Sequence, residues 1–167
     1  MSKRIAYADP PYPGCAHLYP EREEVDHAAL LAQLESGFDG WVLHTNEPGL
    51  RVVVPLMPKG ARVMAWVKPF CAFKRNVPVA YAWEPVIVKA CRKPVVSGRE
   101  VPMRDWKAES ITMKKGLTGA KPPAVCRWLF EMVGAKPGDD LVDLYPGTGI
   151  VTATWQEWCL EADDGTE

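Results

Sequence analysis

Four consecutive residues near the N-terminus, Asp9-Pro10-Pro11-Tyr12, present one hydrogen-bond acceptor beside one flat ring. Two prolines fix two φ angles and remove two backbone donors, so neither a helix nor a central strand continues through them. The apolar run at residues 4–8 therefore ends as a strand before Asp9 and passes into a stiff, extended turn. Holding an acceptor and a ring in fixed positions is costly, so we expect a ligand to be held by this turn.

A second turn that could bind a ligand follows the apolar run at residues 140–145. Pro146-Gly147-Thr148-Gly149 leads from that strand into a helical pattern over residues 149–162. Glycines allow a sharp bend and a close backbone approach to a ligand, and a helix N-terminus offers free N–H groups. The third glycine of the dinucleotide fingerprint is missing, and a tight strand-to-helix turn explains the pattern equally well. Asp143, at the end of the strand, either accepts hydrogen bonds from a ligand ammonium or caps the turn.

The charge of the chain is unevenly distributed. Residues 59–127 hold fifteen of the twenty Lys and Arg but only four of the twenty-one acids. A basic middle between acidic ends predicts a surface for a polyanion, and the alternative is an uneven but merely solvated surface. Residues 92–120 lie within this segment, are basic, and fit neither a strand nor a helix period. We expect them to form a substrate loop that a partner orders.

Hydrophobic periodicity predicts an α/β fold with an open, mostly parallel sheet and helices on both faces. Length and ordinary composition favour one domain over residues 1–167. No apolar run is long enough for a membrane span and no signal peptide is evident, so we expect a soluble, cytoplasmic protein. Five cysteines without a CxxC pair argue against a disulfide framework or a metal site. The predicted strands are 4–8, 40–45, 61–67, 81–90 and 140–145, and the predicted helices are 24–36, 48–57, 122–134 and 149–162.

Together the two corners resemble the S-adenosylmethionine (SAM)-dependent amino-methyltransferases. That family carries Asp/Asn/Ser-Pro-Pro-aromatic as its catalytic motif and Phe-x-Gly-x-Gly as its cofactor motif. Further stretches of this chain match the family in order: "GWVLHTN", "AWVKPF", "YAWEPVIV" and "AKPPAVCRWLFEMV". The match covers most of the chain and is greatest for small phage and bacterial DNA adenine methyltransferases, relatives of the messenger-RNA adenosine methyltransferases. The resemblance implies a Rossmann-like, permuted class I methyltransferase fold that is truncated at the C-terminus.

The resemblance implies transfer of a methyl group from SAM to the exocyclic amine of adenine in DNA. The Asp9 carboxylate and the Pro10 carbonyl would accept hydrogen bonds from that amine, with Pro11 keeping the turn rigid and Tyr12 stacking on the base. No metal is implied. The residues implied to bind the cofactor are Asp143, Tyr145, Pro146, Gly147, Thr148, Gly149 and Lys121.

Candidate substrate-binding residues lie in the basic middle of the chain. Lys114 and Lys115 are expected to contact nucleic acid. Glu84 stands inside an apolar strand, where an unpaired carboxylate is expensive, so we expect a polar role near the site with Lys68 as its partner. The alternative for Lys121 is a solvated lysine ahead of a helix. We expect His44 to be structural and Tyr81, Trp83 and Trp66 to pack in the core, with Trp106 free to stack on bases.

The sequence departs from the family after the glycine corner. Most relatives continue into a strand whose acidic residue binds the cofactor ribose, and nothing of that kind follows residue 162. Glu157, Glu161 and Asp163 are the available substitutes, although helix phase does not favour them. Weak cofactor binding, completion by a second subunit of a homo-oligomer and loss of activity therefore stay open. The competing functions are a catalytically silent nucleic-acid-binding relative and a methyltransferase acting on RNA or another amine.

Overall fold

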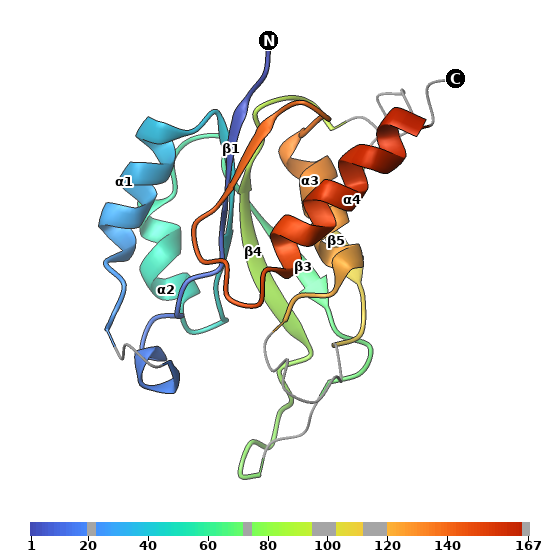
Figure 1. The fold of residues 1–167 in the computed structure, drawn as a ribbon. Coiled ribbons are helices and arrows are strands. Elements are labelled where there is room, and N and C mark those ends of the chain that lie inside the picture. Colours follow the sequence, from blue (N-terminus) through green and yellow to red (C-terminus); the bar gives the residue numbers. More distant parts are fainter. Residues whose placement is uncertain (20–22, 72–74, 95–102, 112–119, 165–167) are drawn as a thin grey trace.

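The computed structural model describes residues 1–19, 23–71, 75–94, 103–111 and 120–164. Its centre is a six-stranded sheet with the strand order β5-β3-β4-β2-β1-β6 (Figure 1). Only β4 runs against its neighbours β2 and β3, while the other three neighbouring pairs are parallel. The predicted mostly parallel sheet is therefore confirmed. The strands are β1 (Arg4–Ala8), β2 (Gly40–His44), β3 (Arg62–Val67), β4 (Trp83–Lys89), β5 (Trp106–Ala108) and β6 (Asp140–Asp143).

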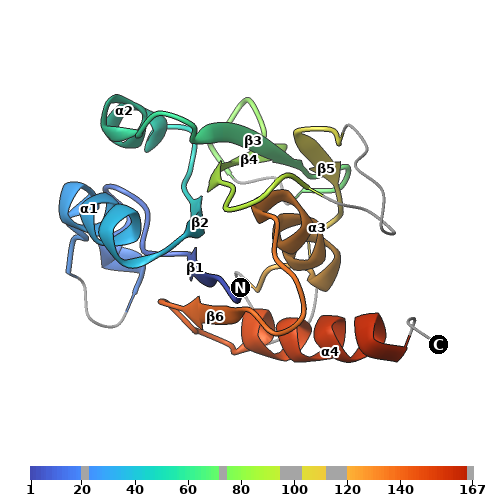
Figure 2. The same ribbon diagram turned by 90° about the horizontal axis from the view of Figure 1, so that it is seen from above.

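Helices cover both faces of this sheet, as the alternation of patterns predicts. Figure 2 shows α1 and α2 on one side of β1 and β2, and α3 and α4 on the other. Short 3-10 turns, η1 and η2, follow β1 and α2. The helices are α1 (His27–Gly37), α2 (Leu50–Val53), α3 (Pro123–Val133) and α4 (Ile150–Asp164), and the turns are η1 (Ala16–Leu18) and η2 (Val54–Leu56).

Successive side chains of β1 point to opposite faces of the sheet and belong to two hydrophobic cores, one on each face. Ile5 and Tyr7 belong to the core beneath α3 and α4, whereas Ala6 and Ala8 belong to the core beneath α1. All four side chains are fully buried. Because both faces of β1 are covered, this strand is a rigid support for the turn that follows it.

Two details differ from the expected elements. Residues 92–120 show no clear hydrophobic period, yet they contain the short edge strand β5. This strand is stabilised by backbone hydrogen bonds to β3 and not by a pattern of its own side chains. The predicted helix at 48–57 divides into α2 and η2, with Pro55 at the start of the second turn. No helix in the ranges given above has both the length and the apolarity to cross a membrane.

Candidate active site at one edge of the sheet

The predicted site residues of five strands lie at a single edge of the sheet. Asp9, His44 and Asp143 lie at the carboxyl ends of the parallel strands β1, β2 and β6. Lys68 directly follows β3, and Glu84 lies at the start of β4, which runs the other way. Reversal of β4 therefore places Glu84 at the edge where the parallel strands end. Ligands of open α/β sheets bind at such an edge.

The Lys121 ammonium lies among the polar groups of this edge and is buried, with 6% of its surface exposed. Its Nζ is 3.2 Å from Asp9 Oδ2 and 2.8 Å from Glu84 Oε1, and it donates to the Tyr12 hydroxyl at 2.9 Å. Burial lowers the pKa of Lys121, but the charges of Asp9 and Glu84 outweigh burial and raise it. Lys121 is thus a fixed cation in the site and not the solvated lysine of the alternative interpretation.

Glu84 is the buried acceptor that links this lysine to neighbouring strands. Its Oε1 accepts from the Tyr12 hydroxyl at 2.8 Å, and its Oε2 accepts from Lys68 Nζ at 3.0 Å, the predicted contact. Burial alone would raise the pKa of Glu84, but Lys121, His44 and Lys68 reverse the effect and hold it well below its usual range. The carboxylate is therefore ionised and paired.

His44 continues the network into the core. Its Nδ1 lies 3.1 Å from Glu84 Oε1 and its Nε2 lies 2.7 Å from the Tyr7 hydroxyl. An ionised carboxylate only accepts, so the Nδ1–H of His44 donates to Glu84. Burial is the largest cause that raises the pKa of Tyr7 well above its ordinary value, which keeps this hydroxyl a donor. His44 is fully buried, consistent with the structural role expected for it.

Asp9, His44 and Glu84 bring potential metal-ligand atoms within 4.8 Å of one another. The Lys121 ammonium contacts both carboxylates of this group. The Lys121 ammonium already supplies the positive charge that a metal ion would bring. The geometry therefore favours carboxylates paired with a lysine over carboxylates that bind a metal ion.

A small cavity of about 150 Å³ connects the two motifs. Asp9 and Lys121 line it, together with Tyr145, Gly147 and Thr148 of the glycine corner. Pro146 also lines the cavity, while Gly149, with φ of 74°, turns the chain into α4. The structure therefore places the Asp-Pro-Pro-Tyr turn and the glycine corner against one shared space.

Asp143 carries an unsatisfied oxygen next to this corner. Its Oδ1 accepts from the backbone N–H of Tyr145 at 3.3 Å, whereas its buried Oδ2 has no hydrogen-bond partner within the described part of the chain. Burial first, and then the nearby Asp9 charge, raise the pKa of Asp143. Capping of the turn uses one oxygen, and the other is available to a ligand donor.

A larger cavity of about 530 Å³ lies beside Tyr12. Its lining includes four aromatic side chains, those of Tyr12, Tyr19, Tyr81 and Trp83. Lys68 and Glu84 supply polar groups to it. This size and this mixture are typical of a pocket for a planar organic ligand.

Several sequence predictions are wrong, and others concern residues outside the described part of the chain. Tyr81 and Trp83 were expected in the core but are 52% and 40% exposed, because their chain segment leaves the sheet at this edge, while Trp66 is buried as expected. Lys114 and Lys115 lie outside the described residues, so their predicted contacts have no structural counterpart. Glu157 and Glu161 both pair with Arg127 of α3, at 3.6 and 2.5 Å, which turns them away from a cofactor role.

Sequence reasoning missed two residues of the site. Tyr19 lines both cavities, and Tyr7 orients His44. Neither residue belongs to a motif, although Tyr7 is the one polar side chain among the four buried residues of β1. A polar tip on a buried aromatic residue usually has a partner, and this signal could have identified Tyr7.

Comparison with known proteins confirms the fold. No family model matches the sequence, and no curated protein does. Among solved structures, the crystal structure of the M1.HpyAVI–SAM complex superposes with a TM-score of 0.66 at 15% sequence identity, over 95% of this chain and 79% of the other. The crystal structure of M1.HpyAVI superposes with a TM-score of 0.60 at 15% identity, over 95% and 78%. The chain therefore has the Rossmann-like α/β fold of M1.HpyAVI.

Proposed function

We propose that this protein transfers a methyl group from SAM to the exocyclic amine of adenine in nucleic acid, with DNA as the expected substrate. One observation carries the proposal: a single turn places Asp9 in the lining of a small cavity at the glycine corner and Tyr12 in the lining of a larger cavity with aromatic side chains. A methyl donor in the first cavity and an adenine in the second would meet at this turn. The shared fold with M1.HpyAVI, which was crystallised with SAM, supports the choice of donor.

The residues at the glycine corner fit the methionine part of SAM. The unpaired Asp143 Oδ2 is a suitable acceptor for its ammonium group. The Lys121 ammonium, which lines the same cavity, would attract its carboxylate. When bound, SAM supplies a methyl group made electrophilic by the positive sulfur. Tyr145, Gly147 and Thr148 would surround that end of the molecule.

Asp9 would act on the adenine amine, which is a poor nucleophile because its lone pair is delocalised into the ring. As the nitrogen would bond to the methyl carbon, the carbon–sulfur bond would break and leave a neutral thioether. Positive charge would pass to the nitrogen, so that its hydrogens become better donors, and one of them would then leave as a proton. The Asp9 carboxylate and the Pro10 carbonyl would accept them. Lys121 occupies only part of the lone-pair capacity of Asp9, so acceptor sites remain for the amine. A fixed anion facing developing positive charge stabilises the transition state.

The larger cavity suits the acceptor base. Tyr12 is held by Glu84 and Lys121, so its ring orientation is set before a base arrives. Stacking on such a ring offsets part of the cost of about a few kcal/mol for moving a base out of its strand. A DNA substrate is also consistent with the basic character of residues 59–127.

The proposal is tested by replacing Asp9 with Asn, which retains shape and removes the charge. We expect methyl transfer to adenine-containing oligonucleotides to fall by at least about a hundredfold, because a fixed charge that stabilises a transition state contributes on that scale. SAM affinity, measured by calorimetry, should change little. Asp140→Asn makes the same change at the end of β6 opposite the site, on a side chain that is 63% exposed, and as the matched control it should retain activity.

Two results would contradict the proposal. One is normal turnover by the Asp9→Asn protein. The other is tight oligonucleotide binding by the wild-type protein without any SAM binding or methyl transfer, which would favour the silent nucleic-acid-binding alternative.

A further inference from the structure

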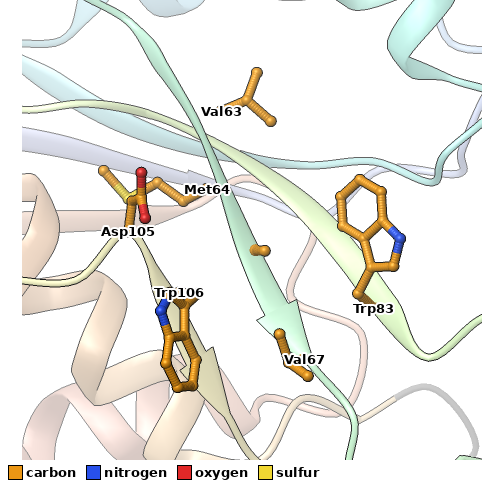
Figure 3. Close-up of a pocket in the computed structure, with 7 residues that line it drawn as sticks. Val63, Met64, Val67, Trp83, Asp105 and Trp106 are labelled. Carbon is orange, nitrogen blue, oxygen red and sulfur yellow. The ribbon is translucent and has the colours of Figure 1, made fainter.

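A second aromatic surface lies beside the site, on the face of the sheet opposite α3. The register pairs Val67 with Trp83 and Ala65 with Trp106, so these side chains share one face, while Trp66 faces the core on the other. Figure 3 shows Trp83 and Trp106 on opposite sides of β3, with Val67 between them. Together with Val63, these residues line an open groove of about 580 Å³, here called the indole groove.

The indole groove is apolar yet exposed. Trp83 is 40% exposed, Trp106 is 43% exposed and Val63 is 36% exposed. Residues of the same face nearer the middle of the sheet, such as Ile87, are buried in the core beneath α1. Two indoles left open on one face of a small protein indicate a binding surface.

The indole groove adjoins the larger cavity of the candidate site, because Trp83 lines both. A chain that places one base beside Tyr12 would therefore bring its next residues toward Trp83 and then Trp106. Since β3 lies between β4 and β5, the two indoles stand about two strand spacings apart, roughly 10 Å. That spacing leaves room for one base ring on each indole.

Basic side chains at the edge of the indole groove favour nucleic acid over an apolar protein partner. The described residues that line the groove belong to the basic segment 59–127, and the one charged residue among them is Asp105. The Arg104 guanidinium stands 5.4 Å from the centre of the Trp106 ring. Arg62, with 67% of its side chain exposed, reaches the same end of the groove, where it pairs with Asp105 at 2.7 Å. Aromatic platforms edged by basic side chains are typical of single-strand binding.

We propose that the indole groove binds unpaired bases adjacent to the target, by stacking on Trp83 and Trp106, and that the protein therefore prefers single-stranded nucleic acid. This inference rests on the proposed function for the identity of the neighbouring site. Its physical basis is separate, because stacking requires neither SAM nor Asp9. A duplex keeps its bases stacked on one another, so it offers no free ring faces to these indoles.

The test is fluorescence anisotropy with a labelled single-stranded oligothymidylate, which contains no adenine and needs no methyl donor. We expect Trp106→Ala to weaken binding by about tenfold, the loss of one base–aromatic stack. Trp106→Phe should retain most of the affinity. The dependence of binding on salt should keep its slope, because stacking releases no counterions. Leu160→Ala, on the exposed side of α4, is the control and should bind normally.

Three results would overturn the inference. One is unchanged binding by both Trp106→Ala and Trp83→Ala. Another is equal affinity for the single strand and a duplex of the same length. The third is a wild-type dimer in sedimentation that Trp106→Ala converts to a monomer, since the groove would then hold a second copy. Failure of methyl transfer with intact, indole-dependent binding would reject the proposed function alone.

Discussion

At the scale of single residues, the site is a balanced set of charges, of which those of Glu84 and Lys121 are buried. Asp9 and Glu84 are the anions, and Lys68 and Lys121 are the cations. Each charge has at least one partner within 3.2 Å. Removing one member leaves an uncompensated charge in a poorly hydrated place, which costs more than the pair itself contributes.

Glu84→Ala should therefore lower the free energy of unfolding by roughly 3–5 kcal/mol. Glu35 offers a matched control, because it pairs with Lys89 but its side chain is 29% exposed. Glu35→Ala should cost about 1 kcal/mol or less, since solvent screens an exposed pair. Urea unfolding measures both values, and equal losses would show that burial of the Glu84 network is not what stabilises it.

Asp143→Asn tests the unpaired oxygen at the glycine corner. We expect SAM affinity, measured by calorimetry, to fall by about tenfold to a hundredfold, the contribution of a hydrogen bond between charged groups. Asp140→Asn is the control on the same strand, because its side chain is 63% exposed and pairs with Arg4. An Asp143→Asn protein that binds SAM as well as wild type would remove Asp143 from the cofactor site.

Some of these residues could be identified from sequence because one local feature marks them. The prolines mark Asp9, and a carboxylate within an apolar strand marks Glu84 and its need for Lys68. The contact between Lys121 and Asp9 could not be predicted, because it joins residues 112 positions apart through the placement of α3 against β1. The exposure of Trp83 was also misjudged, because the apolar run does not show where the sheet edge lies.

At the scale of elements, α3 positions Lys121 and must be held at both ends. Pro122 is its N-cap, and the residue before a proline is restricted to extended backbone, which fixes the entry of Lys121. Gly134 ends the helix in the left-handed conformation with φ of 77°. A Cβ at Gly134 would stand 2.5 Å from the Arg92 carbonyl oxygen, so backbone packs directly against this turn.

Gly134→Ala should destabilise the protein by more than the cost of a left-handed alanine, which is about 1–2 kcal/mol. Gly138 separates the two effects, because it also has positive φ, 84°, but has no atom within 4 Å of an added Cβ. Gly138→Ala should show the conformational cost alone in urea unfolding. If the two variants unfold alike, the close approach of Arg92 has no energetic consequence.

The order and types of most elements could be predicted because their hydrophobic periods are clear. The helix at 122–134 has both a starting proline and a closing glycine, and α3 matches it closely. The edge strand β5 could not be predicted, because a strand of three residues carries too little periodic pattern. Its order comes from pairing with β3, a contact between segments about 40 residues apart.

At the scale of the whole molecule, paired carboxylates set the dependence of stability on pH. Burial raises the pKa of Glu84 and of Asp139, but their cationic partners outweigh burial and hold both below their usual range. A depressed folded pKa contributes stability above the unfolded value of about 4 and loses it as pH falls through the folded value.

Thermal melting should therefore show a plateau at neutral pH and a decline below about pH 4. Glu84→Gln should lower the melting temperature at neutral pH. The melting temperature of this variant should also decline less steeply in acid, because the variant lacks a carboxylate whose pKa is lower in the folded state than in the unfolded state. A wild-type protein that becomes more stable as pH falls through that range would contradict the assigned pairing.

The central claim is that the Asp9 turn joins a methyl donor to an adenine amine. The most direct measurement is mass analysis of nucleosides after incubation of the wild-type protein with SAM carrying an isotopically labelled methyl group and single-stranded oligodeoxynucleotides. The proposed chemistry predicts deoxyadenosine that has gained one labelled methyl group on its exocyclic nitrogen. Label on another base, or none on any nucleoside while SAM is bound, would contradict it.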